Sequence, residues 1–229
     1  MTSGTGPVIA IDGPVGAGKT TVARALAHSL GFSHINTGAM YRAVALAARA
    51  RYTGGELSGP EIERRLGEIL NSISIKFDRE RVLLDGRDIS DAITAPAIAD
   101  LASRLSALGL VRTRMRDLQR AAGENGRVVM EGRDIGTVVF PDAEFKFFLT
   151  AAVAVRAARR YAELAAQGVA ISEAEVLAQL RERDQRDEAR ELAPLRPAAD
   201  ATWIDASLLS VDEVVQQMKT HIQRKAGLS

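Results

Sequence analysis

Short apolar runs and longer stretches of helical periodicity follow one another along most of this chain. Short apolar runs indicate strands buried on both faces, and apolar positions spaced three and four residues apart indicate amphipathic helices. The pattern predicts strands at 8–12, 32–36, 127–130, 144–149 and 202–205, and helices at 19–30, 39–51, 96–108, 111–122, 153–166, 173–192 and 211–225. Because the two kinds of element alternate, we expect an α/β protein whose parallel sheet has helices on both faces.

The segment 60–90 departs from this alternation. A helix predicted at 61–70 is followed at 72–77 by strict period-two alternation, which is typical of a half-exposed antiparallel strand. A turn at 78–80 and short apolar partners at 82–84 and 87–89 complete the pattern, and a glycine-rich break at 53–60 precedes it. We expect a small α+β insertion carried by the larger body.

Length and composition exclude several classes. A chain of 229 residues buries one good core with a small insertion, and no apolar stretch is long enough to span a membrane. The first seven residues lack a secretory signal pattern and read as a loose leader. The chain has no cysteine, which fits a reducing cytoplasm. The formal net charge of +1 gives no general attraction to nucleic acid.

Arginine dominates the basic residues. Five of the 30 are lysine, which leaves 25 arginines, the side chain best suited to bidentate phosphate binding. A genome-wide codon bias gives the same excess, so composition alone does not decide between these explanations.

The run GPVGAGKT, which follows the strand predicted at 8–12 and opens a helix, is the strongest local signal. The pattern G-x-x-x-x-G-K-[ST] between a strand and a helix is that of a phosphate-binding loop, in which backbone N–H groups and the helix N-terminus face phosphate oxygens. The alternative is a plain glycine-rich turn. The phosphate-loop reading assigns nucleotide binding to Gly13, Pro14, Val15, Gly16, Ala17, Gly18, Lys19 and Thr20, with a threonine hydroxyl for Mg²⁺.

Charged residues gather in three further places. Arg183, Arg186, Asp187 and Arg190 have the i, i+3, i+4, i+7 spacing of one helical face, although such a face is often merely solvated. Arg133 and Asp134 follow the strand at 127–130, at the sheet edge where α/β proteins bind ligands, or form a simple turn salt bridge. The third place is the start of the helix after 32–36, where TGAMYR puts Arg42 one turn inside a second anion site.

Four motifs together, IDGPVGAGKT, TGAMYR, EGRDIGTVVFPDA and RERDQRDEARELAPL, resemble bacterial cytidylate kinases in order and spacing. The resemblance runs from Val8 to about Ile222, and its second pair of motifs is far more specific than the phosphate loop. These proteins are P-loop nucleoside monophosphate kinases. The resemblance implies an ATP-binding core (1–59, 91–155 and 193–229), a monophosphate-binding insertion (60–90) and a helical lid (156–192).

The same resemblance implies residue roles. Lys19, Arg133, Arg186 and Arg190 would act on the transferred phosphoryl group, and Thr20 or Thr21 would hold Mg²⁺. Arg156, Arg159 and Arg160 enter the lid toward ATP, and the sequence leaves open which of them touches phosphate. The residues expected to contact CMP or dCMP are Thr37, Tyr41, Arg42, Ser103, Arg112, Arg133, Asp134, Arg183, Asp187 and Arg190.

Several positions depart from the usual family pattern. Val15 replaces a serine, Thr20 a glycine, Thr37 a serine, Glu131 an aspartate, Thr94 an arginine and Gly109 a proline. Because of the change at Thr94, one phosphate or sugar contact is either missing or supplied elsewhere, and we expect glycine at position 109 to loosen the loop that holds Arg112.

The expected activity is Mg²⁺-assisted transfer of the ATP γ-phosphoryl group to CMP or dCMP by a cytoplasmic monomer, without a general base. The three histidines, His28, His34 and His221, lie outside every motif. Two rivals remain. A P-loop kinase for a small alcohol such as shikimate needs an aspartate base near the loop, and Asp12 leaves that class open. A nucleotide-driven switch or nucleic-acid motor needs a metal-binding aspartate at the end of a strand and a basic or aromatic surface that follows the nucleic acid. Here Glu131 ends the predicted strand, and aromatic residues make up 4% of the chain.

Overall fold

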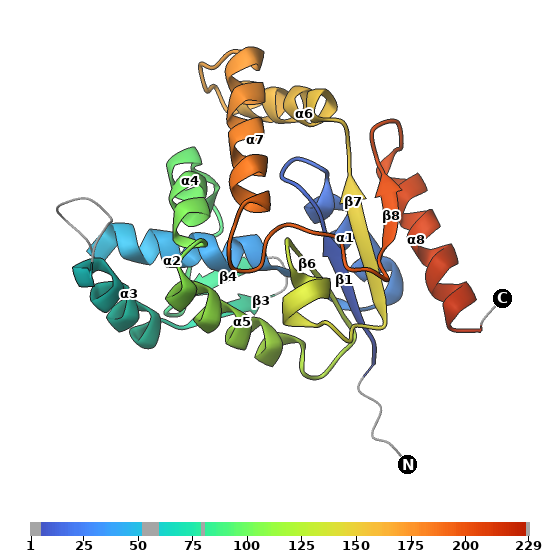
Figure 1. The fold of residues 1–229 in the computed structure, drawn as a ribbon, viewed down its shortest axis with the longest axis horizontal. Coiled ribbons are helices and arrows are strands. Elements are labelled where there is room, and N and C mark those ends of the chain that lie inside the picture. Colours follow the sequence, from blue (N-terminus) through green and yellow to red (C-terminus); the bar gives the residue numbers. More distant parts are fainter. Residues whose placement is uncertain (1–5, 52–59, 79–80, 228–229) are drawn as a thin grey trace. The chain divides into compact units, whose positions relative to one another are not determined.

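The computed structural model describes residues 6–51, 60–78 and 81–227 (Figure 1). The chain divides into two compact units. The first comprises Met1–His34 and Asn125–Ser229, and the second comprises Ile35–Glu124. Part of the predicted 53–60 break, part of the 78–80 turn and most of the leader lie outside the described residues.

The five-stranded sheet supports the first unit. Its order is β2-β6-β1-β7-β8, and β2 (Ser33–Asn36) begins in this unit. The central strand β1 (Val8–Asp12) pairs in parallel with β6 (Val128–Gly132) and β7 (Phe145–Thr150), and β7 pairs in parallel with β8 (Thr202–Asp205). The predicted α/β class with a parallel sheet is therefore confirmed.

Two helices line this sheet. Apolar positions of α1 (Lys19–Leu30) and α8 (Val211–Lys225) pack with those of the strands in one core, and α8 begins with a capping box of Ser210 and Glu213. Ile9, Val129 and Phe147 are buried at its centre. Since β1 ends inside this core, the loop that follows Asp12 leaves from the carboxyl edge of a central strand, where ligands bind in open α/β sheets.

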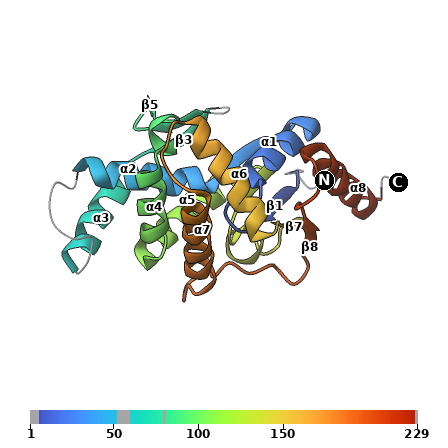
Figure 2. The same ribbon diagram turned by 90° about the horizontal axis from the view of Figure 1, so that it is seen from above.

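The helices α6 (Val153–Ala166) and α7 (Glu173–Glu188) lie side by side in both views (Figures 1 and 2). They pack through the apolar side chains of Ala157, Leu164, Val176 and Leu180. The prediction of one helix over 173–192 was wrong at its end, because α7 stops at Glu188. The chain then turns back, with the Leu195 N–H donating to the Asp187 carbonyl at 2.8 Å, so Arg190 lies beyond the helix.

The second unit has a core of its own. Its helices are α2 (Thr37–Arg51), α3 (Pro60–Ser72), α4 (Pro96–Leu105) and α5 (Gly109–Gly123), with a 3₁₀ turn at Ala92–Thr94. Val44, Leu66, Ile98 and Met115 are buried among them.

The antiparallel strands β3 (Ile75–Asp78), β4 (Arg81–Leu84) and β5 (Arg87–Asp88) confirm the predicted small sheet. β3 starts later than the alternation suggested because α3 continues to Ser72, and the helix predicted to end at 108 ends at Leu105. Across the described parts of both units, no helix has the length and apolar character needed to cross a membrane.

Candidate active site

The loop between β1 and α1 has the backbone that a phosphate-binding loop requires. Gly13 packs so closely on β7 that a Cβ there would lie 2.0 Å from the Leu149 carbonyl oxygen. Gly16 and Gly18 have φ values of 77° and 89°, a left-handed conformation that only glycine adopts without strain. The glycines of the motif are thus explained by this backbone, and Lys19 starts α1 directly behind them.

Lys19 lies in the middle of a cluster of charges. Its side chain is buried, and its ammonium group donates to the Pro14 carbonyl at 2.7 Å. Burial, followed by the positive charge of Arg133, holds the pKa of Lys19 well below its ordinary value, while Glu131, Asp12 and Asp187 oppose that shift. Within the first unit, the charge of Lys19 in the phosphate loop therefore interacts with charges of the segment 131–133 and with Asp187.

The arginines gather around Asp187, whose side chain is only 1% exposed. Its carboxylate accepts a hydrogen bond from Arg133 Nε at 2.9 Å and another from Arg190. Burial alone would raise the pKa of Asp187, but the positive charges of Arg133, Arg190 and Arg183 outweigh it, so the pKa lies below its ordinary value. The structure thus brings Arg133 and the arginines near the end of α7 to one place.

A second buried carboxylate, Glu131, lies next to the last residue of β6, in the strand beside β1. It is paired in register with Ile11, and its side chain is 5% exposed. The Thr20 hydroxyl donates to Glu131 Oε2 at 3.0 Å, and His34 Nε2 lies 3.1 Å from Oε1. Hydroxyl and carboxylate oxygens are the hard donors that Mg²⁺ prefers, so these residues fit the ion expected there. The contact of His34 with Glu131 was not predicted, because His34 belongs to no sequence motif.

Asp12 holds the turn that carries Asp134. Its two carboxylate oxygens accept the backbone N–H groups of Ile135 and Gly136, each at 2.8 Å, at the start of a π-helical turn over Ile135–Val139. Burial raises the pKa of Asp12 to about 6 despite these hydrogen bonds. Asp12 is the residue that left an alcohol kinase open as an alternative, and both of its carboxylate oxygens accept hydrogen bonds from this backbone turn.

Of the arginines on α6, Arg156 contacts the phosphate loop. Its guanidinium donates to the carbonyls of Ala151 at 2.9 Å and Val15 at 3.0 Å, and it lies 2.7 Å from Asp184 Oδ2. Arg159 instead donates to the Ala206 carbonyl, and Arg160 pairs with Glu163 on the surface. Asp184, for which no sequence motif indicates a role, joins α7 to the loop through Arg156.

Five of the residues predicted to contact the acceptor nucleotide belong to the second unit. Thr37 is buried at the start of α2, and Tyr41 and Arg42 are half-buried on the same helix. Ser103 on α4 is 7% exposed, and its buried hydroxyl has no hydrogen-bond partner among the described residues. The Arg112 guanidinium donates to the Ser106 carbonyl at 3.2 Å, so it lies at the end of the helix that carries Ser103.

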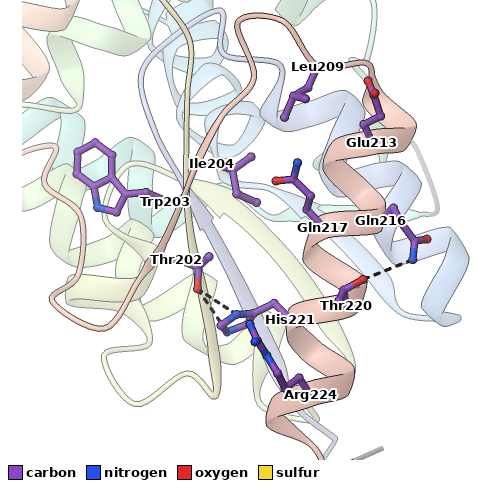
Figure 3. A pocket seen from close by; sticks show the side chains of 10 residues that line it. All are labelled: Thr202, Trp203, Ile204, Leu209, Glu213, Gln216, Gln217, Thr220, His221 and Arg224. Atoms are coloured by element: carbon purple, nitrogen blue, oxygen red, sulfur yellow. Dashed lines mark hydrogen bonds between the residues drawn. The ribbon is translucent and has the colours of Figure 1, made fainter. Parts of the chain in front are cut away.

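A pocket of about 460 Å³ lies between β8 and α8, at an edge of the sheet (Figure 3). None of the predicted site residues lines it. Figure 3 shows His221 facing the Thr202 hydroxyl across it, with Trp203 turned away from α8. Its lining residues are Thr202, Trp203, Ile204, Leu209, Glu213, Gln216, Gln217, Thr220, His221 and Arg224.

Comparisons with known proteins show the family to which the chain is similar. The family model described as cytidylate kinase matches residues 9–224. The cytidylate kinase of Pelotomaculum thermopropionicum is 48% identical over 219 residues, covering 94% of this chain and 96% of that protein. That of Geobacter sulfurreducens is 46% identical over 224 residues, covering 96% and 94%. A crystal structure of an uncharacterized protein from Eubacterium ventriosum has a TM-score of 0.50 at 13% identity, covering 95% of this chain and 99% of that one, a likeness of fold alone. By its family model and these relatives, this chain belongs to the cytidylate kinase family.

Proposed function

We propose that this enzyme transfers the γ-phosphoryl group of ATP to the 5′-phosphate of CMP or dCMP, giving ADP and CDP or dCDP. The observation that carries the proposal is the cluster in the first unit, where Arg133, Arg183 and Arg190 surround the buried carboxylate of Asp187 and the charge of Arg133 acts on Lys19. Cations held this way are suited to a phosphoryl group passing between two polyanions.

The reaction needs charge compensation more than proton transfer. The attacking phosphate is largely dianionic near pH 7, since its second pKa is about 6, so no general base is required. Two unit charges ~4 Å apart repel by about 4 kcal/mol at an effective dielectric constant of ~20. Lys19, Arg133, Arg186 and Arg190 are the cations we assign to offset that repulsion.

On the ATP side, the backbone of residues 13–18 would face the phosphates, with Lys19 and Thr21 at the start of α1 and Arg156 and Arg160 from α6. Mg²⁺, when bound, supplies charge neutralisation between the phosphates. Of the two threonines expected for the ion, Thr20 is the better supported because its hydroxyl already lies 3.0 Å from Glu131.

On the acceptor side, Thr37, Tyr41 and Arg42 would contact the CMP phosphate, and Arg183 and Asp187 the sugar. Cytosine offers a donor amine, suited to Asp134 or Ser103, and acceptors at N3 and O2, suited to Arg112, whereas uracil reverses part of this pattern. The buried Ser103 hydroxyl finds no hydrogen-bond partner in the part of the chain that the structure describes, which supports a role in base contact, since such groups are otherwise satisfied.

We assign monophosphate binding to the segment 60–90 and lid closure to 156–192, with the core formed by 1–59, 91–155 and 193–229. Arginines supplied by a lid would exclude water, so that ATP is not hydrolysed instead. From the family resemblance we also propose a cytoplasmic monomer.

A coupled assay of ADP release with CMP, dCMP, UMP, AMP and GMP tests the proposal. We expect CMP or dCMP to accelerate ADP release most, and the proposal is falsified if none of the five does. The variant Asp134→Ala should lose far more activity with CMP than with UMP. An equal loss with both acceptors would show that Asp134 does not read the base.

A further inference from the structure

His34 is the one histidine whose ring reaches the buried charges of the first unit described above. It lies on β2, the neighbour of β6 in the sheet, and its side chain is 19% exposed. The strand is fixed at its start by a hydrogen bond from the Ser33 N–H to the Arg127 carbonyl at 2.9 Å. The backbone of His34 is therefore held beside the strand that carries Glu131.

The ring and the Thr20 hydroxyl engage opposite oxygens of one carboxylate. His34 Nε2 lies 3.1 Å from Glu131 Oε1, and Thr20 Oγ1 donates to Oε2 at 3.0 Å. An ionised carboxylate only accepts hydrogen bonds, so the ring must present Nε2–H to it. Together the two donors fix the rotation of a carboxylate that is 5% exposed.

The orientation of the Thr20 hydroxyl follows from this arrangement. Its proton points to Glu131, and a hydroxyl that donates its single proton keeps its lone pairs for acceptor or ligand contacts. A hydroxyl turned the other way would direct a proton at a cation. A partner that fixes a ligating group in this way belongs to the outer shell that tunes metal affinity.

We propose that His34 is a positioning residue for this reaction. It donates Nε2–H to Glu131, which in turn holds the Thr20 hydroxyl ready for the cation of the metal–nucleotide complex. This proposal rests on the proposed function, because that reaction uses a metal–nucleotide complex, but it does not depend on which nucleotide is the acceptor.

The test measures metal binding rather than turnover. Mn²⁺ is titrated into the enzyme saturated with ADP, and free Mn²⁺ is followed by electron paramagnetic resonance. The variant His34→Leu removes the donor at similar volume, and we expect it to weaken Mn²⁺ binding about tenfold. Binding of ADP without metal should stay unchanged. The matched control is His28→Leu, an exposed histidine near the end of α1, which should bind Mn²⁺ as the wild type does.

Two amide variants separate positioning from folding. The amide nitrogen of His34→Gln reaches about as far as Nε2 and should restore most of the Mn²⁺ affinity, whereas the shorter His34→Asn should not. The comparison of His34→Gln with His34→Asn tests the positioning role even if His34→Leu fails to fold, because both amide variants keep a polar side chain at this position. Equal affinity for the two amides, or wild-type affinity in a folded His34→Leu, would overturn the proposal.

The ring itself gives a third readout. Proton–nitrogen NMR correlations of the histidine side chains should show His34 protonated at Nε2, and a neutral ring protonated only at Nδ1 would contradict the hydrogen bond. These measurements use ADP and Mn²⁺ alone. If instead CMP, dCMP and the other monophosphates all fail to accelerate ADP release, the proposed function fails while the positioning role is still decided by Mn²⁺ binding.

Discussion

Two groups of arginines and carboxylates in this protein have the same spacing in sequence and opposite settings in the structure. On α3, Glu61 pairs with Arg64 and Arg65, and Arg64 also pairs with Glu68, by i, i+3 and i, i+4 contacts. Beside α7, Asp187 pairs with Arg190 by the same i, i+3 spacing. The α3 side chains are 47–64% exposed, whereas that of Asp187 is 1% exposed.

The difference shows that sequence spacing identifies a charge pair, whereas burial determines how strongly its charges interact. Hydrogen bonds from Arg64 and then Arg65 lower the pKa of Glu61 to about 2, yet water surrounds the pair and leaves it little energetic weight. At Asp187 the arginines must overcome the cost of burial before they lower the pKa at all. Of the two groups, the buried one therefore fits the phosphate-binding role that we propose.

The largest effect that tests this comparison concerns turnover. We expect Arg190→Met to lower kcat by about 10²–10³-fold, because a preorganised cation near the transferred group stabilises charge that develops in the transition state. The measurement is steady-state ADP release with CMP, alongside circular dichroism to confirm folding.

The matched variant on the exposed helix is Arg64→Met, which should change kcat less than twofold. Unchanged turnover in Arg190→Met would show that the charges around Asp187, like those on α3, do not contribute to catalysis.

The next effect is on stability. We expect Asp187→Ala to lower the free energy of unfolding by about 3–5 kcal/mol, since it removes the buried carboxylate that the partly buried Arg133 and Arg190 share. Urea unfolding at pH 7 measures it. Because the folded pKa of Asp187 lies below the unfolded value of 3.8, its contribution is fully present above about pH 5 and is lost as the pH falls through the folded pKa. A gap between variant and wild type that stays constant down to pH 3 would contradict the lowered pKa.

Asp12 sharpens the comparison because it is also buried, but its carboxylate accepts hydrogen bonds from the backbone N–H groups of Ile135 and Gly136 where Asp187 accepts them from arginines. Its folded pKa of about 6 lies above the unfolded value of 3.8, so the folded state binds more protons between those values and stability falls as the pH rises through them. We expect the free energy of unfolding of Asp12→Asn, relative to wild type, to improve by about 2–3 kcal/mol between pH 3 and pH 7. Urea unfolding across that range measures the difference, and a flat difference would show that the pKa is not raised.

Much of the fold could be predicted because its signals are local. The predicted strands 8–12 and 202–205 and the predicted helices 19–30, 153–166 and 211–225 match the observed elements at both ends. Each has a strong apolar pattern, and several have a cap or glycine at the boundary. The end of α7 was missed because Glu188 to Arg190 remain good helix formers, and the turn depends on a later contact, the Leu195 N–H with the Asp187 carbonyl.

The site was less predictable from sequence than the fold. Motifs gave the phosphate loop and the arginines around Asp187, whose proximity the structure confirms within the first unit. The contacts of His34, Asp12 and Asp184 were not predicted, because each side chain acts through a partner far away in sequence: Glu131, the 135–136 backbone and Arg156. A side-chain contact between two strands, or across a loop, leaves no periodic pattern in the amino-acid sequence.

The smallest effect belongs to the exposed group and tests whether screening explains the contrast. Glu61→Gln removes the carboxylate shared by Arg64 and Arg65, and we expect the melting temperature to fall by no more than about 2 °C at low salt. Since the Debye length shrinks to about 3 Å at 1 M salt, that difference should vanish in 1 M NaCl. The loss in Asp187→Ala should persist there, because ions in solution do not reach a side chain that is 1% exposed. Scanning calorimetry of both variants at low and high salt measures this. If both differences disappear together, Asp187 is accessible to solvent ions, and burial is not what separates the two groups.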